Sequence, residues 1–336
     1  MNNEPLVSIG IPVFSGAASI SRTLDSILAQ NYTNIEIIVC DNNSPDKTVE
    51  IVKDYQKTDK RIKLIQHPQN IGMFKNFNST FLHSSGEFFM WVAHDDDRSP
   101  EFISECLKPL LLNSKAVLCS PITIAFYKGE ACWIASMPKY RKGERLSSRY
   151  LKTLNEFPAT AIYGLYRSSA IRKTRLWGQF LGGDIAFIQE LSIQGEFERV
   201  DVPLFQYHER ERWTSVEQDF SRIFVTSRKP RIYSPYIVFL KEQILSLCKL
   251  NKSLDSFLGL VLALIYHHMS RLPSKIARGL NSKFLPKPYK IRIAQYLYWK
   301  FFHNPNVEVI NQEYFLNRNI LPMMRVENKT CSDEET

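Results

Sequence analysis

The sequence lacks the features that mark several large classes of protein. Its six cysteines are scattered and no two form a Cys-x-x-Cys pair, so we expect free thiols in a reducing compartment and no disulfide framework. The N-terminal residues Met-Asn-Asn-Glu-Pro carry neither a basic region nor an apolar core, so we expect no secretion signal. The apolar run at residues 257–266 is too short to cross a bilayer.

What is present is a chain with ample material for a core and an uneven charge. It has 336 residues, more than one ordinary domain, and a hydrophobic fraction of 44% that excludes general disorder. The net charge of +9 comes from residues 223–336, which hold 17 Lys and Arg against 8 Asp and Glu. A basic region of this kind fits contact with an anionic membrane surface, and equally a solvated basic face. We expect no nucleic-acid partner.

Apolar runs and helical periodicities alternate along the first 120 residues. Runs typical of buried parallel strands occupy residues 6–13, 35–40, 62–65 and 87–92. Helical spacing follows the first three runs, starting at Ser19, at Ser44-Pro45 and after residues 69–72. This pattern predicts an α/β fold with a mostly parallel, doubly wound sheet, in which ligands bind outside the carboxyl ends of the strands.

Three consecutive carboxylates, Asp95, Asp96 and Asp97, follow the fourth predicted strand. Adjacent negative charges repel one another, which a solvated turn tolerates but the mouth of a buried strand does not unless a cation is bound there. Oxygen ligands of this type suit Mg²⁺ or Mn²⁺ held jointly with substrate phosphates. The stretches 12–14 and 41–43 end neighbouring strands, and their convergence with the aspartates favours a metal–diphosphate site over a simple polar turn.

Two glycine-rich phosphate-binding motifs are absent. The turn after the first strand reads PVFSGAA, without the G-x-G-x-x-G of dinucleotide-binding domains, and the sequence contains no Walker loop. A metal ion would therefore have to neutralise a bound diphosphate, which agrees with the three aspartates.

Four motifs, in this order and spacing, resemble glycosyltransferase family 2, whose members have the GT-A fold. They are VSIGIPVF, IEIIVCDNNSPDKT, QNIGMFKNFN and SSGEFFMWVAHDDDRSPEF. The resemblance implies that the turn after strand one wraps the nucleotide base, that the Asp after strand two bonds base or ribose, and that the aspartates hold Mn²⁺ or Mg²⁺ on the diphosphate. The nucleotide-binding residues expected on this basis are Pro12, Val13, Phe14, Asp41, Asn43, Asn70, Gly72, Lys75 and Asp95.

The sequence departs from the family pattern at two places. Many relatives carry Ala-Arg-Asn where this chain has residues 76–78, Asn-Phe-Asn, so the contact of the missing Arg is expected from Lys75. Ala93 stands where relatives often carry another Asp, which leaves Asp95 in the usual metal-ligand position. Whether Asp96 or Asp97 is the second participant stays open.

The expected acceptor side comes after residue 120. In the stretch GGDIAFIQEL, Asp184 either caps a helix or acts as the general base that takes the proton from the acceptor hydroxyl, the role that the resemblance implies. Glu190 is expected to be structural. His208, at the end of a closing strand over 200–208, is either a metal or diphosphate contact or a polar strand end. The acceptor-side residues expected are Gly164, in a strand over 161–167, Gly183 and Trp213.

Three further segments complete the expected organisation. We assign residues 1–225 to a GT-A catalytic domain, with a nucleotide-sugar half (1–120) and an acceptor half (121–225). Residues 139–149 are basic and polar, and read as a loop or a lid. Residues 226–325 form a basic helical region, either docked on the domain or lying at a membrane interface, and residues 326–336 a disordered tail.

The sequence thus predicts a metal-dependent inverting glycosyltransferase. It would move a sugar from a nucleotide-diphosphate donor, with a UDP-sugar favoured, to a glycan or lipid-linked acceptor in cell-surface polysaccharide synthesis. Two alternatives are a nucleotidyltransferase-like enzyme, whose usual glycine-rich loop is missing, and a non-catalytic nucleotide-sugar-binding protein, against which Asp41, Asp95 and Asp184 argue. We expect a cytoplasmic protein, with a peripheral position on the inner face of the membrane as an open alternative.

Overall fold

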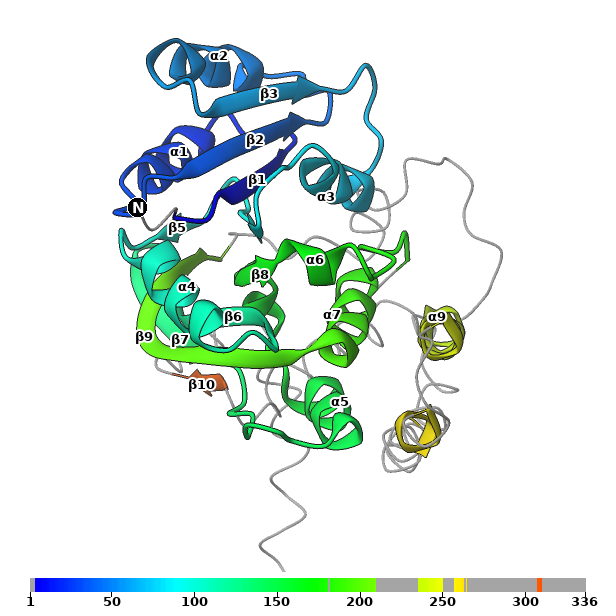
Figure 1. Ribbon diagram of the computed structural model, residues 1–336. Helices are drawn as coiled ribbons and strands as arrows, with labels where there is room; N and C mark the ends of the chain where they lie inside the picture. The colour runs from blue at the N-terminus through cyan, green and yellow to red at the C-terminus, as the bar shows by residue number, and fades with distance from the viewer. Residues whose placement is uncertain are drawn as a thin grey trace, which may run out of the picture.

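A computed structural model of the chain describes residues 4–180, 182–209, 235–249, 257–262, 264 and 307–309. Its centre is a ten-stranded mixed sheet (Figure 1). Eight strands follow one another in the order β10-β7-β6-β8-β4-β1-β2-β3. The other two lie off this path: β9 pairs with β6, and β5 pairs with β9. The strands are β1 (Val7–Val13), β2 (Ile35–Asp41), β3 (Ile62–Gln66), β4 (Phe88–Trp91), β5 (Asp97–Arg98), β6 (Ala116–Tyr127), β7 (Glu130–Ala135), β8 (Leu165–Arg167), β9 (Glu196–His208) and β10 (Val307–Val309).

Helices cover both faces of this sheet. They are α1 (Ile20–Leu28), α2 (Thr48–Thr58), α3 (Met73–Leu82), α4 (Phe102–Leu112), α5 (Leu146–Glu156), the 3-10 turn η1 (Ala159–Tyr163), α6 (Ser168–Ile171), α7 (Gly183–Gln194) and α9 (Pro235–Lys249). Residues 257–262 are also helical. Among the helices that the structure describes, none combines the length and the apolar composition that a membrane crossing requires.

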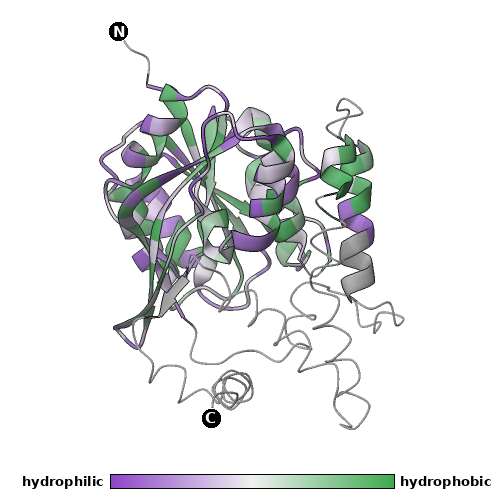
Figure 2. Cartoon of the chain, turned by 90° about the horizontal axis from the view of Figure 1, so that it is seen from below, coloured by the Kyte–Doolittle hydropathy of each residue, from purple (hydrophilic) through white to green (hydrophobic). Residues whose placement is uncertain are grey.

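The first four strands pair as the sequence predicts. β1 lies between β2 and β4, and β2 pairs with β3, all in parallel, so the carboxyl ends of these strands meet at one edge. The strands β1, β2 and β4 are buried on both faces, which explains their nearly continuous apolar runs. Hydrophobic residues gather along the central strands, as Figure 2 shows. The α/β fold with a mostly parallel doubly wound sheet is thereby confirmed.

The two faces of the sheet carry separate apolar cores. One packs β1, β2 and β4 against α1 and α4, with Ile9, Leu24 and Phe102 completely buried. The other is rich in aromatic rings and packs α3 and α7 against β4, with Trp91 at its centre. A smaller third cluster joins α5, α7 and α9 to Leu260 and Leu264. The described residues of 241–248 and 257–264 therefore pack against α5 and α7.

Four local expectations were wrong or incomplete. α2 begins at Thr48 instead of at Ser44-Pro45, because the Asp46 carboxylate accepts hydrogen bonds from both the backbone N–H and the hydroxyl of Thr48. Residues 161–167 are only partly a strand, since η1 occupies their first half. The basic stretch 139–149 ends inside a helix, because α5 begins at Leu146. Ser19 precedes α1 as expected, but its side chain does not cap the helix.

Candidate functional site

The ends of β1 and β2 form one wall of the candidate site. Val13 pairs with Asp41, the last residue of β2. Asp41 is 2% exposed, and its Oδ2 atom accepts a hydrogen bond from the backbone N–H of Ser44. Its Oδ1 atom is buried without a hydrogen-bond partner. A buried carboxylate oxygen left unpaired costs free energy, so this atom is suited to accept a hydrogen bond from a ligand.

Side chains between β2 and the start of α2 fix the position of the turn after β1. Three successive backbone N–H groups donate to side chains of this segment: Ser15 to Ser44 Oγ at 2.9 Å, Gly16 to Thr48 Oγ1 at 2.9 Å, and Ala17 to Asp46 Oδ2 at 3.1 Å. Pro12 and Val13 are buried, whereas the side chain of Phe14 is 43% exposed. Of the three predicted base-wrapping residues, Phe14 is thus the one whose side chain reaches solvent.

Asparagines fix the entrance to α3. The Asn42 side chain accepts from the Ile71 N–H at 2.8 Å and donates to Asn70 Oδ1 at 2.9 Å, and Asn70 Oδ1 also accepts from the Gly72 N–H. Gly72 has φ 88° and ψ 155°, a conformation available essentially to glycine alone. The predicted residues Asn70 and Gly72 are therefore placed together, while Asn42, which follows β2 directly, was not recognised from the sequence.

The departure from the family at residues 76–78 has a structural explanation. The buried Asn76 amide donates to the carbonyl oxygens of Val13 and Cys40, so it ties together the ends of β1 and β2. Phe77, where relatives carry Arg, stacks on Trp177 with ring centroids 4.3 Å apart. Lys75 is exposed on the same helix. Asn43 has a left-handed φ of 62°, which a short polar side chain tolerates.

The aspartate turn is anchored to α1. The Arg22 guanidinium donates to the Asp95 carbonyl at 2.6 Å and to Asp97 Oδ1 at 3.0 Å. Thr23 donates its hydroxyl to the Asp96 carbonyl at 3.1 Å. The Nδ1 atom of His94 lies 3.0 Å from the hydroxyl of Ser19, a further contact between the turn and α1. α1 therefore sets the position of the turn.

The three carboxylates differ in environment. Asp96 is 1% exposed, its Oδ1 atom accepts from the backbone N–H of His208, and its Oδ2 atom is buried without a partner. Burial, with the neighbouring Asp95 charge, raises the pKa of Asp96 well above its usual range. Burial alone would also raise the pKa of Asp97, but His208 and Arg22 outweigh it and lower that pKa. Asp97 is thus an anion whose Oδ2 atom lies 2.8 Å from His208 Nε2.

These groups fit a metal that is held jointly with a ligand. Within the part of the chain that the structure describes, no three His, Cys, Asp or Glu side chains are grouped closely enough to hold a metal alone. Carboxylate oxygens and an imidazole nitrogen are nevertheless metal-ligand atoms, and the anionic Asp97 beside His208 offers both kinds. Mg²⁺ in particular takes few protein carboxylates and completes its shell with phosphate and water.

A buried arginine behind the turn was not predicted. Arg98 is 3% exposed, donates to the Trp91 carbonyl at 3.2 Å, and lies over the Phe205 ring at 4.6 Å. Burial lowers the pKa of Arg98 to about 10, and the Asp96 charge opposes that shift. Arg98 stabilises the carboxylate cluster from inside. In the sequence, the only indication that Arg98 belongs to the site was its position directly after the three aspartates.

Asp184 lies in the first turn of α7, a helix that packs against β4. The helix is preceded by Gly182, so Asp184 is not the N-cap residue. Phe187 of α7 meets Trp91 edge to face at 5.3 Å, which packs the helix against the strand that leads into the aspartate turn. Glu190 is buried and ion-paired with Arg175, which confirms a structural role.

Two of the three expected acceptor-side residues, Gly164 and Gly183, are described in the structure. A Cβ on Gly183 would lie 1.9 Å from the Gly178 carbonyl, and one on Gly164 would lie 2.4 Å from the Cys119 carbonyl. Both glycines thus permit close backbone packing. Trp213 lies outside the described residues.

Comparisons with known proteins identify the chain. The sequence model described as Glycosyl transferase family 2 matches residues 8–175, half of the chain. An uncharacterized glycosyltransferase of Rickettsia typhi is 40% identical over 116 residues, 34% of this chain and 35% of that protein. A Bacillus subtilis protein named as a putative glycosyltransferase, EpsH, is 27% identical over 265 residues, 76% of this chain and 75% of that protein. The hyaluronan synthase of Pasteurella multocida is 30% identical over 119 residues, 35% of this chain and 12% of that protein.

Solved structures agree in fold. The crystal structure of S. aureus TarS 1-349 in complex with UDP-GlcNAc has a TM-score of 0.58 and 17% identity, covering 79% of this chain and 72% of that one. The mannosyltransferase PcManGT from Pyrobaculum calidifontis, in complex with GDP-Man and Mn²⁺, has a TM-score of 0.51 and 15% identity. The match covers 98% of this chain and 88% of that one. The alignments with the first curated relatives span about a third of those proteins' length. On the match over half of its length, the chain belongs to glycosyltransferase family 2.

Proposed function

We propose that the chain is a metal-dependent, inverting glycosyltransferase that uses a nucleotide-diphosphate sugar, with a UDP-sugar favoured. The observation that carries the proposal is the convergence, at one edge of a parallel sheet, of the unpaired Asp41 Oδ1 with the Asp97–His208 pair of the aspartate turn. Solved structures of similar fold with UDP-GlcNAc, UDP, or GDP-Man and Mn²⁺ support it.

The nucleotide would bind along the ends of β1 and β2. Asp41 Oδ1 would accept a hydrogen bond from the base or ribose, and Phe14 would cover the base. Pro12, Val13, Asn43, Asn70, Gly72 and Lys75 complete the proposed nucleotide-binding set. Lys75 is exposed near the start of α3, where its ammonium group supports a role opposite the anionic diphosphate.

Mn²⁺ or Mg²⁺ would be held by Asp95 and Asp97, with His208, on the diphosphate oxygens. Asp96 is turned into the protein, which favours Asp97 as the second carboxylate and gives Asp96 the task of fixing the His208 backbone. When bound, the cation neutralises the charge of the departing nucleoside diphosphate.

Asp184 is the proposed general base. In a single displacement the acceptor oxygen attacks the anomeric carbon, its proton passes to Asp184, and the nucleoside diphosphate leaves from the opposite face. Asp184 is half-buried at the start of α7, so an acceptor could reach its carboxylate. Gly164, Gly183 and Trp213 remain the proposed acceptor-side residues.

The acceptor is proposed to be a glycan or a lipid-linked sugar in polysaccharide synthesis. Relatives named hyaluronan synthase and chondroitin synthase support a polymer-forming role. The excess of basic residues after residue 222 supports peripheral contact with an anionic membrane. Flotation with anionic liposomes, compared with neutral liposomes, tests this contact, and equal recovery with both would contradict it.

The deciding experiment is release of UDP from a panel of UDP-sugars in the presence of Mn²⁺. We expect release by the natural chain and none by Asp95→Ala. A nucleotidyltransferase would instead form a sugar nucleotide and pyrophosphate from a nucleoside triphosphate and a sugar phosphate. A binding protein would be stabilised by the donor without releasing UDP.

A further inference from the structure

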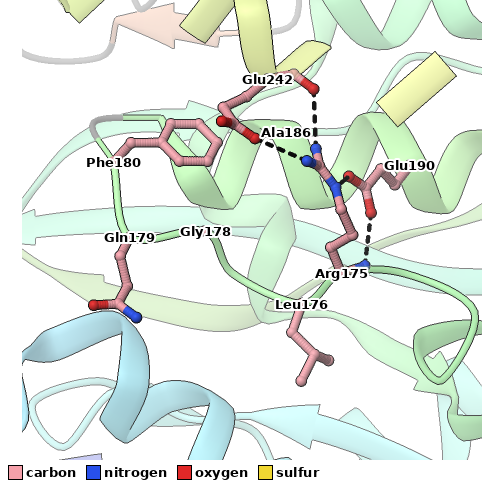
Figure 3. Close-up of a pocket in the computed structure, with 8 residues that line it drawn as sticks. All are labelled: Arg175, Leu176, Gly178, Gln179, Phe180, Ala186, Glu190 and Glu242. Carbon is pink, nitrogen blue, oxygen red and sulfur yellow. Dashed lines mark hydrogen bonds and ion pairs between the residues drawn. The ribbon is translucent and has the colours of Figure 1, made fainter. Parts of the chain in front are cut away.

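Residue Arg175 joins the helix that carries the proposed base to helix α9. Its Nε atom donates to Glu190 of α7 at 2.5 Å, and its backbone N–H donates to the other oxygen of Glu190 at 2.7 Å. From α9, Glu242 accepts from Arg175 Nη1 at 2.8 Å, and Ser246 also bonds the guanidinium. Figure 3 shows the guanidinium between the two glutamates. We call Arg175, Glu190, Glu242 and Ser246 the arginine knot.

The knot is more than a surface ion pair. Glu190 and Ser246 are buried, and Ser246 donates its hydroxyl to Glu190 at 2.6 Å. Beside it, the buried amides of Gln189 and Gln243 bond one another at 3.0 Å and again link α7 to α9. Buried charges of this kind depend on complete pairing, since removal of one partner leaves the other desolvated and unpaired. The knot therefore specifies one position of α7 against α9.

A cavity lies on the side of α7 that faces the arginine knot. Its volume is about 230 Å³, and its lining consists of Arg175, Leu176, Gly178, Gln179, Phe180, Ala186, Glu190 and Glu242 (Figure 3). The cavity is partly open to solvent, so on this side of α7 the guanidinium fork supplies the hydrogen bonds that fix the helix, whereas Phe187 and Ile188 fix its other side by apolar packing.

The two residues after Arg175 connect the knot to the donor side of the molecule. Trp177 exchanges two backbone-to-amide hydrogen bonds with Asn78 of α3, each 3.0 Å long, and stacks on Phe77. Leu176, between the two anchors, has a left-handed φ of 61°. A bulky residue adopts that conformation only where its surroundings enforce it. The segment 175–177 is thus fixed at both ends and strained in the middle.

We propose that the arginine knot and the segment 175–177 are the positioning device of the base, setting α7 and Asp184 relative to the donor-side helix α3. This inference rests on the proposed function. It assigns a task to α9, which lies beyond the residues that the family model matches. Misplacement of a catalytic group by about 1 Å can cost about a hundredfold in rate, so loss of the knot should lower turnover more than donor binding.

The test compares Arg175→Lys and Glu242→Gln with Glu36→Gln. Lysine keeps the charge but cannot supply the fork of donors. Glu36 belongs to a buried hydrogen-bond network at the opposite ends of the strands, so its variant controls for lost stability. We expect both knot variants to lower kcat for UDP release about tenfold or more with donor KM within about twofold, and Glu36→Gln to leave kcat unchanged.

A second measurement does not depend on the donor. Hydrogen exchange in residues 183–187 should be faster in both knot variants than in the natural chain, with α3 unaffected. Unchanged exchange and unchanged kcat would overturn the inference, as would an equal fall in kcat in Glu36→Gln. If Asp184→Asn turns over normally, the proposed base is wrong. If Asp184→Asn is inactive while Arg175→Lys has normal kcat, the positioning inference alone is wrong.

Discussion

The Nε2 atom of His208 lies 2.8 Å from the Oδ2 atom of Asp97. This contact joins the end of β9 to the turn after β4, which are 111 residues apart along the chain. The backbone N–H of His208 also donates to Asp96, so both the backbone and the imidazole of His208 are fixed by the aspartates. An imidazole and a carboxylate fixed at this separation offer two ligand atoms to one cation.

We therefore expect His208→Ala to weaken metal use. The Mn²⁺ concentration for half-maximal UDP release should rise about 10- to 100-fold, the usual effect of losing a group around a metal site. The control is His83→Ala, since His83 lies at the end of α3 and its ring bonds Ser79 of the same helix. An unchanged Mn²⁺ requirement in His208→Ala would remove His208 from the site. Chelator should abolish release, and added Mn²⁺ should restore it.

Asp184→Asn should separate donor binding from turnover. The amide keeps the size of the side chain but cannot take a proton, so kcat should fall by about 10² to 10⁴ while the donor still stabilises the protein. Thermal shift with a UDP-sugar and Mn²⁺ checks binding, and UDP release checks turnover. Full activity would contradict the base assignment, whereas lost binding would indicate a donor contact.

Asp41→Asn should weaken donor binding and leave metal binding unchanged. The carboxylate oxygen that has no partner in the protein becomes part of an amide, which cannot accept at both positions. Loss of one such bond to a charged acceptor costs about 1.5–3 kcal/mol, or about 10- to 150-fold in affinity. Isothermal titration with UDP measures the change. Asp25→Asn, on the exposed side of α1 where Asp25 bonds Tyr55, is the matched control.

The sequence predicted the sheet edge well because that edge is specified locally. Each parallel strand is an apolar run, and the polar residues that follow it must lie at the same edge, so Asp41 and Asp95 could be placed without a structure. Side chains that act through long-range contacts could not be placed in this way. Asn76 was noticed only as a departure from the family, whereas its amide holds the carbonyls of two strands.

Contacts between distant segments explain the remaining misses. Arg98 depends on Phe205, and the Arg175 knot depends on α9, in each case on residues far along the chain. The start of α2 was misplaced because Ser44 and Asp46 serve the turn after β1. No local pattern distinguishes a cap from a side chain that bonds a neighbouring turn.

Gly72→Ala should lower donor affinity through the backbone. The left-handed φ of 88° at Gly72 strains any L residue, and this glycine opens α3 beside Asn70. Gly129→Ala is a matched control, because Gly129 has φ 87°, sits in the β6–β7 turn, and has open space where the alanine methyl group would lie. Both variants should lose about 1 kcal/mol of stability. Only Gly72→Ala should weaken UDP binding, and equal affinities in the two variants would contradict a local role for Gly72.

Glu36→Gln should destabilise the fold in a pH-dependent way. Burial raises the pKa of Glu36, but hydrogen bonds from Lys63, Ser8 and Ser85 outweigh it and lower the pKa to about 2. Because the folded-state pKa is below the usual value of about 4.3, the carboxylate stabilises the fold above that pH, and this stabilisation is lost as pH falls toward 2. At pH 7 the variant should unfold more easily by about 2–3 kcal/mol, since a shift of one unit corresponds to about 1.4 kcal/mol. Urea unfolding at pH 7 and pH 3 measures the free energy of unfolding of both proteins. The difference between the natural chain and Glu36→Gln should be smaller at pH 3 than at pH 7. An equal difference at the two pH values would show that the effect arises from packing instead of charge.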